Sequence, residues 1–360
     1  MSAASGRPRA GPHRGAQHEG TPVNTPVILN ERDGSRFAQG EGDTILRAAL
    51  RAGVGLSYEC NSGGCGGCKF DLLSGEVETL WADAPGLTAR DRQRGRHLAC
   101  QCRAVGDVSI KAACAPEYVP LRVPGRQRAR LTGMSDITHD LREFRFRTEG
   151  RADFLPGQYA MLDLPGVAAS RAYSLSNTPN EQGEWHFQIR RVPHGQGTHA
   201  LFDRLACGDE IGLDGPYGVA WLRTAVPRDI VCVAGGSGLA PMISIARGAA
   251  EAGLLATRKL YFFYGARTPR DVCGEAMLAQ LEGFGERIHY IPVVSLPGDE
   301  GAWQGETGYV HDALTRTLPG GLPGFEFYFA GPPPMTQALQ EMLMVGHRVP
   351  FEQIHFDRFF

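Results

Sequence analysis

The pattern of hydrophobic and polar positions changes twice along the chain, which indicates three successive units. From 27 to 110, short apolar runs flank turns such as Asp33-Gly34, a typical hairpin signal. One stretch has helical spacing, with Asp43 as its expected N-cap and Gly53 at its end. A second strand pair is expected to turn at Ser74-Gly75, and Thr88 is expected to cap a short helix. This unit therefore predicts a small sheet packed on a helix.

A linker and a strand-rich unit come next. Residues 115–126 contain three prolines and little periodicity, so we expect a semi-extended linker. From 127 to 225, short strands alternate with Gly and Pro turns, and helix signals are few. This texture predicts a small antiparallel β-barrel.

The last unit, 226–360, alternates strands and helices. Apolar strand runs occur at 229–234, 261–264, 290–294 and 325–329, and a helical pattern covers 242–252. This alternation predicts a parallel α/β domain. With residues 23–114 as the first domain, the chain has three domains, preceded by a Gly-, Pro- and Arg-rich tail, 1–22, which we expect to be disordered.

Charge and hydropathy exclude two classes of partner. The formal net charge of −2 gives no broad basic surface for nucleic acid. No apolar run approaches the ~20 residues that a membrane-spanning helix needs. We therefore expect neither nucleic-acid binding nor a membrane span.

Cysteine spacing carries the strongest chemical signal. Cys60, Cys65 and Cys68 follow the pattern C-x4-C-x2-C, and a fourth cysteine lies far downstream. This spacing is typical of a plant-type [2Fe–2S] cluster held by four thiolates. Structural zinc is the alternative, but zinc sites usually take two separate ligand pairs. We predict a [2Fe–2S] cluster.

Periodicity alone leaves the fourth ligand open. Cys100 and Cys102 both belong to a strand-like run from His97, and residues two apart face the same side of a strand. The chain has nine cysteines, an odd number, and the others show no disulfide framework. This usage predicts a reducing, cytoplasmic setting.

The predicted barrel contains a motif that resembles the flavin motif of the ferredoxin–NADP reductase superfamily. The motif is Arg171-Ala172-Tyr173-Ser174, at the end of a strand. The resemblance implies that Arg171 pairs with flavin phosphates and that Tyr173 lies on the ring face. It also implies that Ser174 hydrogen-bonds flavin N5, where the hydride arrives, which makes it a catalytic candidate.

Two further barrel segments match the same superfamily at the separations that it would have. Gln188-Ile189-Arg190 resembles the strand that lines the flavin, and Gly195, Gly197 and Thr198 belong to a turn that resembles the pyrophosphate-binding segment. Because a pyrophosphate segment is present, the resemblance implies FAD rather than FMN.

The third domain carries segments that resemble the nicotinamide site of this superfamily. Glycines after a strand let a pyrophosphate approach backbone N–H groups at a helix start. The matching residues are Gly235, Gly236, Ser237, Gly238, Pro241, Gly265, Arg267, Gly331, Pro332 and Met335. The chain departs from its relatives at Ala330, where a cysteine often stands.

The choice between NADH and NADPH depends on a cation for the 2′-phosphate. The segment 295–300 is acidic and has no base, although Arg267 and Arg270 could still reach that phosphate. On this charge argument we predict NADH.

The C-terminal run 355–360 resembles the acidic-x-aromatic ending that lies near the flavin in this family. We expect Phe359 to cover the flavin and to swing aside for the nicotinamide. Asp357 is expected to position the nicotinamide in place of the thiol missing at Ala330. Both are therefore catalytic candidates, and the alternative is a hydrophobic tail packed on the core.

Taken together, the order of domains resembles the reductase components of bacterial multicomponent oxygenases, and most closely the toluene and aromatic monooxygenase reductases. The resemblance implies a β-grasp ferredoxin domain, an FAD-binding barrel and a nicotinamide-binding α/β domain, and it favours Cys100 over Cys102. It implies electron flow from NADH through FAD and the cluster to an oxygenase or hydroxylase component, or its ferredoxin.

Three alternatives remain open at this point. The same modules also serve a sugar-deoxygenating enzyme or a Rieske dioxygenase. The third, from a different class, is a non-enzymatic interaction protein stabilised by zinc.

Overall fold

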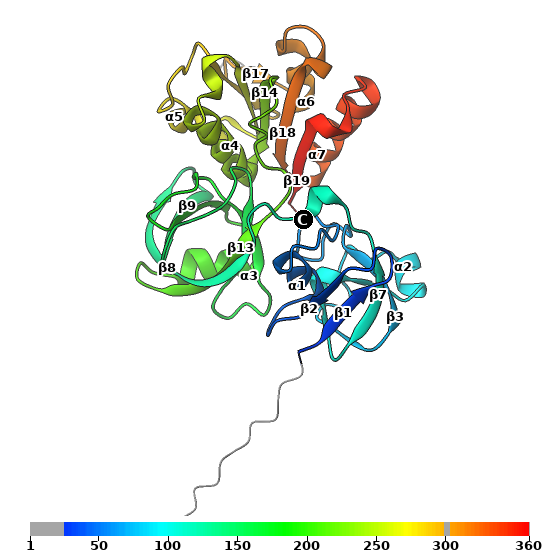
Figure 1. Cartoon of the computed structure of the whole chain (residues 1–360). Coiled ribbons are helices and arrows are strands. Elements are labelled where there is room, and N and C mark those ends of the chain that lie inside the picture. The colour runs from blue at the N-terminus through cyan, green and yellow to red at the C-terminus, as the bar shows by residue number, and fades with distance from the viewer. Residues whose placement is uncertain (1–24, 299–302, 360) are drawn as a thin grey trace, which may run out of the picture.

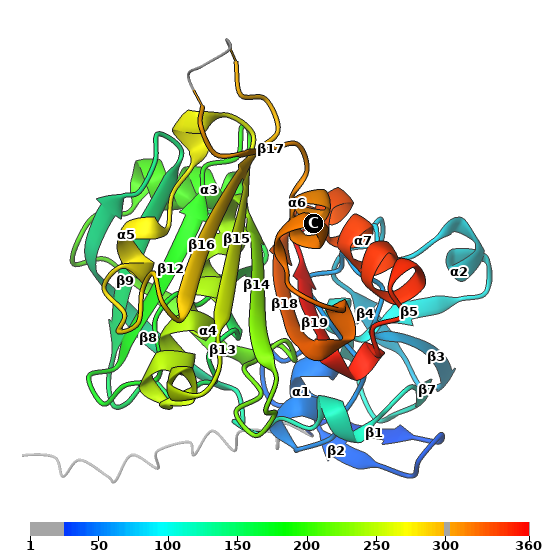
Figure 2. The ribbon, with the colours of Figure 1, turned by 90° about the horizontal axis from the view of Figure 1, so that it is seen from above.

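The computed structural model describes residues 25–298 and 303–359 (Figure 1), so the tail predicted for 1–22 lies outside them. Three units follow one another along the chain and meet near its C-terminal end, as both views show (Figures 1 and 2). No helix in the described part of the chain is long and apolar enough to cross a membrane.

The first unit is a mixed five-stranded sheet, in the order β2-β1-β7-β3-β5, packed on one helix. The predicted hairpin at Asp33-Gly34 is confirmed, because β1 and β2 pair antiparallel. The strands are β1 (Val27–Asn30), β2 (Arg36–Ala38), β3 (Lys69–Ser74), β4 (Val77–Thr79), β5 (Arg96–Leu98), β6 (Cys102–Ala104) and β7 (Val108–Ala112), and the helices are α1 (Ile45–Arg51) and α2 (Ala89–Gln93).

Three local details test the predictions for this unit. Thr44, not Asp43, caps α1 by accepting the Arg47 N–H, and the Asp43 carboxylate instead pairs with arginines. The predicted β3–β4 hairpin is wrong, because β3 pairs with β5 and β7 while β4 pairs with β6. Thr88 does cap α2, in a reciprocal capping box with Asp91.

The second unit is a six-stranded antiparallel sheet in the order β11-β10-β13-β8-β9-β12. A bridge between Leu175 and Phe187 joins its two edges, so the predicted β-barrel is confirmed. Phe144, Phe146 and Trp185 are buried inside it. Its elements are β8 (Gly125–Asp136), β9 (Leu141–Thr148), β10 (Tyr159–Asp163), β11 (Arg171–Ser174), β12 (Glu184–Arg190), β13 (Glu210–Tyr217) and the short helix α3 (Gln196–His199).

The third unit is the predicted parallel α/β domain, with strand order β17-β16-β15-β14-β18-β19. Its strands are β14 (Asp229–Gly235), β15 (Leu260–Ala266), β16 (Ile288–Val294), β17 (Glu306–Thr307), β18 (Phe325–Gly331) and β19 (Ile354–Arg358). The helices α4 (Leu239–Glu251) and α5 (Glu275–Leu278) cover one face, and α6 (Val310–Thr317) and α7 (Pro333–Gln340) cover the other (Figure 2).

The strand order of this sheet reverses at β14. The chain runs from β14 through β15 and β16 on one side, then returns to β18 and β19 on the other. Ligands of open α/β sheets bind at the carboxyl ends of the strands beside such a reversal. The topology therefore directs attention to the loops that follow β14 and β18.

A buried carboxylate joins the first unit to the barrel. Asp214, with a side chain only 1% exposed, lies 2.7 Å from Arg51 Nη2 and 3.5 Å from Arg47 Nη1. Its other oxygen accepts a hydrogen bond of 2.9 Å from the Tyr217 hydroxyl. Because Arg47 and Arg51 belong to α1, this contact fixes the first unit against β13.

We expect Asp214→Ala to lower the free energy of unfolding by about 3 kcal/mol, because it removes the buried carboxylate that two partly buried arginines share. Urea unfolding followed by tryptophan fluorescence measures the loss. Glu210→Ala is the matched control, since its pair with Arg130 is exposed, and it should cost less than about 1 kcal/mol. Equal losses in the two variants would contradict the assignment.

Candidate functional site

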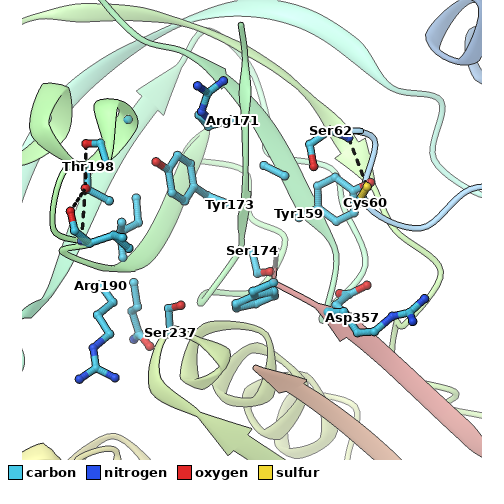
Figure 3. A pocket seen from close by; sticks show the side chains of 18 of the residues that line it. Cys60, Ser62, Tyr159, Arg171, Tyr173, Ser174, Arg190, Thr198, Ser237 and Asp357 are labelled. Atoms are coloured by element: carbon cyan, nitrogen blue, oxygen red, sulfur yellow. Dashed lines mark hydrogen bonds between the residues drawn. The ribbon is translucent and has the colours of Figure 1, made fainter. Parts of the chain in front are cut away.

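A cavity of about 430 Å³ opens where the three units meet (Figure 3). Each unit contributes to its wall, and most of the lining comes from the ends of β11 and β12 and the turn that follows β12. The lining residues are Glu59, Cys60 and Ser62 from the first unit, Tyr159, Arg171–Ser174, Gln188–Arg190, Val192 and Gly195–Thr198 from the barrel, and Ser237 and Asp357–Phe359 from the third unit.

The structure brings all the residues predicted to bind the flavin to this one cavity. Tyr173 lies at its centre, and burial raises the pKa of the Tyr173 hydroxyl to about 12. A β-carbon on Gly197 would lie 2.8 Å from Tyr173 Oη and 3.1 Å from Arg171 Cγ. A larger residue at this position would therefore force the Tyr173 or Arg171 side chain to shift.

Local hydrogen bonds hold the glycine turn against the end of β12. Thr198 Oγ1 lies 3.2 Å from the Val192 carbonyl and 3.1 Å from the Gly195 carbonyl, either of which can accept its proton. Gln188, almost fully buried in β12, presents an Oε1 that has no partner among the described residues. An unpaired buried acceptor in the wall suits a ligand with an N–H donor, such as the isoalloxazine ring.

Arg190 lines the cavity, as predicted, but its guanidinium extends away from Tyr173 and Ser174 (Figure 3). Its Nε donates to Asp140 Oδ2 at 2.6 Å, and its Nη2 lies 3.8 Å from Asp271 of the third unit. A β-carbon on Gly236 would lie 3.2 Å from Arg190 Nη1. Arg190 thus links the barrel to the glycine loop after β14.

The residues predicted to bind the nicotinamide nucleotide gather at the carboxyl edge of the parallel sheet, as the strand reversal requires. Ser237 alone among them lines the cavity. A β-carbon on Gly235 would lie 2.7 Å from Met335 Sδ, and one on Gly331 would lie 2.8 Å from Met335 Cε. The predicted residues outside the lining are Gly235, Gly236, Gly238, Pro241, Gly265, Arg267, Gly331, Pro332 and Met335.

The four predicted cluster ligands form two pairs of thiols. Cys60 contacts Cys65, and Cys68 contacts Cys100. Backbone N–H groups of Ser62 and Cys65 donate to Cys60 Sγ at 3.5 and 3.3 Å. Two pairs suit two irons that each take two thiolates.

Zinc would require a different arrangement, because tetrahedral bonds of ~2.3 Å place all four sulfurs within about 4 Å of one another. Among the described residues, the one triad of possible ligands within 4.8 Å of one another is His139, Asp140 and Asp271. Both of those carboxylates already neighbour the Arg190 cation. The cysteine geometry therefore favours the cluster over zinc.

Cys102 lies apart from these pairs. Its Sγ is 3.8 Å from Thr79 Oγ1 and 3.9 Å from His97 Nδ1, and it is fully buried. The expected strand through both cysteines is interrupted by a 3-10 turn over Ala99–Gln101. This turn removes the period-two relation and directs only Cys100 toward the other ligands.

The last strand brings the C-terminal candidates to the cavity. In the register of β18 and β19, Asp357 lies opposite Ala330, the position that lacks a thiol. Burial, with smaller contributions from Glu59 and Cys60, raises the pKa of the Asp357 carboxyl to about 8. Its Oδ2 is buried and has no partner among the described residues, and this burial favours the protonated form of the carboxyl.

An ion pair joins this strand to the cluster loop, and the sequence analysis did not predict it. Glu59 Oε1 accepts hydrogen bonds from the Arg358 backbone N–H at 3.2 Å and from its Nε at 2.9 Å, and Oε2 accepts from Nη2. The Glu59 carbonyl accepts from the Tyr159 hydroxyl at 2.7 Å. The residue next to Cys60 is thus held by both other units.

The cavity residues missed by the sequence analysis are Glu59, Ser62, Tyr159, Val192, Gln196 and Arg358. Glu59 and Arg358 are 299 positions apart, and no local pattern pairs them. Glu59, Ser62, Val192, Gln196 and Arg358 do lie beside or within predicted motifs. Proximity to those motifs was the one available signal.

We expect Cys100→Ala to abolish the [2Fe–2S] EPR signal of the reduced protein, because it removes one of four thiolate ligands. Cys102→Ala is the matched control and should retain the full signal. The reverse result would show that the ligand assignment is wrong.

A double-mutant cycle should show that Glu59 and Arg358 act as a unit. Glu59→Gln and Arg358→Met should each lower the free energy of unfolding measured in urea. The loss in the double variant should be about 1 kcal/mol smaller than the sum of the two single losses. Additive losses, as expected for two distant sites, would mean that the pair does not couple the strand to the loop.

Comparison with known proteins agrees with the three units. A 2Fe-2S iron-sulfur cluster binding domain matches residues 29–105, an oxidoreductase FAD-binding domain matches 128–221, and an oxidoreductase NAD-binding domain matches 232–341. The cofactors of the chain are therefore a [2Fe–2S] cluster, FAD and a nicotinamide nucleotide.

Full-length relatives share this organisation. The ferredoxin–NAD(P)(+) reductase CarAd of Metapseudomonas resinovorans is 43% identical over 326 residues, covering 89% of this chain and 96% of that protein. The ferredoxin–NAD(+) reductase component of the alkene monooxygenase system of Xanthobacter autotrophicus is 40% identical, covering 91% and 98%.

A solved structure, the ferredoxin reductase in carbazole 1,9a-dioxygenase, superposes with a TM-score of 0.84 at 37% identity and covers 94% of this chain and 99% of that one. The zinc-stabilised interaction protein is thereby excluded, since these relatives are oxidoreductases over almost their whole length. The chain belongs to the family of flavin- and [2Fe–2S]-containing ferredoxin–NAD(P)⁺ reductases that serve as reductase components of multicomponent oxygenases.

Proposed function

We propose that this protein oxidises NADH and passes the electrons through FAD and the [2Fe–2S] cluster to an oxygenase or hydroxylase component, or to its ferredoxin. One observation carries the proposal: a single cavity is bounded by the flavin motif, by Ser237 of the nicotinamide edge and by Cys60 of the cluster loop. A flavin held there has the electron donor and the electron acceptor on adjoining walls.

Bound FAD supplies the conversion between the electron pair of a hydride and the single electrons that a cluster accepts. The residues of the cavity are proposed to bind the FAD and to orient its ring. Arg171 and the Gly195–Thr198 turn are proposed to bind the phosphates, and Tyr173 and Ser174 to fix the ring. Gln188 Oε1 would accept a hydrogen bond from the flavin ring, which would satisfy a buried oxygen that has no partner among the described residues.

The C-terminal strand is proposed to control access to the ring. The Phe359 N–H donates to the Gly331 carbonyl at 3.1 Å, so the aromatic residue stands where β18 ends. Phe359 covers the cavity when no nucleotide is bound, and it must yield to a nicotinamide. Asp357, whose carboxyl has a raised pKa and whose Oδ2 has no partner among the described residues, would donate a hydrogen bond to the incoming ring or to its carboxamide.

NADH remains the proposed donor, on the charge argument. Arg267 and Arg270, the cations that could bind a 2′-phosphate, are exposed beyond β15. The acidic residues Asp299 and Glu300 lie outside the described residues. The proposed domains remain 23–114, 127–225 and 226–360, although β8 begins at Gly125, within the predicted linker.

Relatives point to more than one kind of terminal oxygenase. The xylene/toluene monooxygenase electron transfer component of Pseudomonas putida is 33% identical over 331 residues, which supports our proposal that the terminal partner is an aromatic-hydrocarbon monooxygenase. The resemblance to the carbazole dioxygenase reductase favours a dioxygenase system as the second candidate.

Anaerobic mixing with NADH tests the proposal directly. Flavin absorbance should bleach first and the cluster EPR signal should follow, while NADPH should react more slowly.

Arg171→Ala should purify depleted in FAD, because a charge-assisted contact contributes about 1.5–3 kcal/mol. When FAD is added to this variant, NADH should again reduce the flavin. A variant with full FAD content and unchanged affinity would contradict the role of Arg171.

A further inference from the structure

The cluster loop has a second side, which faces away from the flavin cavity. Its Gly63 lies against Trp81, since a β-carbon there would be 3.2 Å from Trp81 Cε3. The Gly86 N–H donates to the Gly63 carbonyl at 2.9 Å. Residues 80–87 therefore form the outer wall of the loop, and α2 follows them at the end of the first unit that is remote from the barrel (Figures 1 and 2).

Two large apolar side chains are exposed on this outer wall. Leu80 is 41% exposed and Trp81 is 46% exposed. The Leu80 N–H donates to the Gln101 carbonyl at 2.8 Å, and the Gln101 amide lies 3.7 Å from Cys100 Sγ. The exposed pair thus contacts both segments that supply cluster ligands. An exposed tryptophan beside a redox centre is suited to contact with another protein.

Positive charge borders this apolar pair. Arg90, Arg92 and Arg94 of α2 and its C-cap are exposed, and within 25–298 and 303–359 none of the three forms an ion pair. Arg92 Nη2 reaches back to the Ala84 carbonyl at 3.0 Å, which joins the helix to the outer wall. Asp91 does not offset them, because it is buried and pairs with Lys69 at 2.8 Å. Asp83 is exposed in the outer wall and offsets only one of the three positive charges, so the surface stays basic.

We propose that Leu80, Trp81, Arg90, Arg92 and Arg94 form a docking surface for an acidic protein that accepts electrons from the cluster. The proposal rests on the proposed function. In that function electrons reach the cluster from the flavin on the Cys60 side, and the docking surface is where they leave it. Charge complementarity selects the occupant: exposed arginines attract a partner with carboxylates around its redox centre and repel a basic one. Trp81 supplies the apolar anchor of the contact.

The test compares two electron acceptors that carry the same haem group but differ in surface charge. Cytochrome c is basic, and succinylated cytochrome c is acidic. Each NADH oxidised to NAD⁺ and H⁺ delivers two electrons and reduces two ferric haems to ferrous. We expect kcat/KM at low salt to be about tenfold or more higher for the succinylated protein, since electrostatic steering changes association rates by 10–10³-fold. That preference should shrink as the salt concentration rises.

Arg90→Glu/Arg94→Glu should reverse the preference between the two acceptors. The matched control is Arg32→Glu/Arg36→Glu, which makes the same change of net charge on the exposed β1–β2 hairpin and should leave the preference intact. Trp81→Ala should lower kcat/KM severalfold for both acceptors at any salt concentration, and Trp81→Phe should recover part of it. Calorimetry of succinylated cytochrome c with the oxidised protein should show weaker binding for the α2 variant and for Trp81→Ala, and unchanged binding for the hairpin control.

Reduction of ferricyanide by NADH separates this proposal from the proposed function. If NADH fails to reduce ferricyanide in the wild type, the function itself is wrong. If ferricyanide is reduced but the wild type prefers basic cytochrome c, or if the hairpin control shifts the preference as much as the α2 variant, the docking surface is overturned. Cluster EPR of each variant shows whether the loop is intact, and a variant that has lost the signal is replaced by Arg90→Gln/Arg94→Gln.

Discussion

The ion pair between Glu59 and Arg358 is the constraint on which the site depends. Electron transfer needs the nicotinamide edge, the flavin cavity and the cluster loop held together, although they are built by three units far apart in sequence. Glu59 immediately precedes Cys60, and Arg358 immediately precedes Phe359, so one bidentate contact holds both the proposed cluster ligand and the proposed cavity cover in place. The Tyr159 hydroxyl ties the same loop to the barrel.

The cavity itself is built mainly from the rigid ends of strands. Tyr173 and Ser174 end β11, Gln188 and Ile189 lie in β12, and Asp357 lies in β19, so backbone pairing sets where each side chain stands. Asp214, enclosed by arginines, keeps the first unit against the barrel. Phe359, which we propose to move, follows the last residue of β19 and is held there by the hydrogen bond from its N–H to the Gly331 carbonyl.

Sequence reasoning predicted what local chemistry determines. The three units, the cysteine pattern and the turn at Thr198 all follow from residues close together in the chain. The sequence does not reveal tertiary contacts: Asp43 is the expected helix cap, but its carboxylate pairs with arginines from two units. Period-two spacing could not separate Cys100 from Cys102, because the turn at Ala99–Gln101 depends on packing around the ligands. Glu59 and Arg358 could only be paired by the fold.

The central claim is that one cavity places the flavin between the nicotinamide edge and the cluster loop. A crystal structure of the protein purified with its own FAD and cluster tests this claim most directly. The account predicts density for the isoalloxazine ring within the cavity, in contact with Tyr173 and Ser174, with the cluster held by Cys60, Cys65, Cys68 and Cys100 at the adjoining wall. A ring bound outside this cavity, or a cluster loop separated from it, would contradict the account.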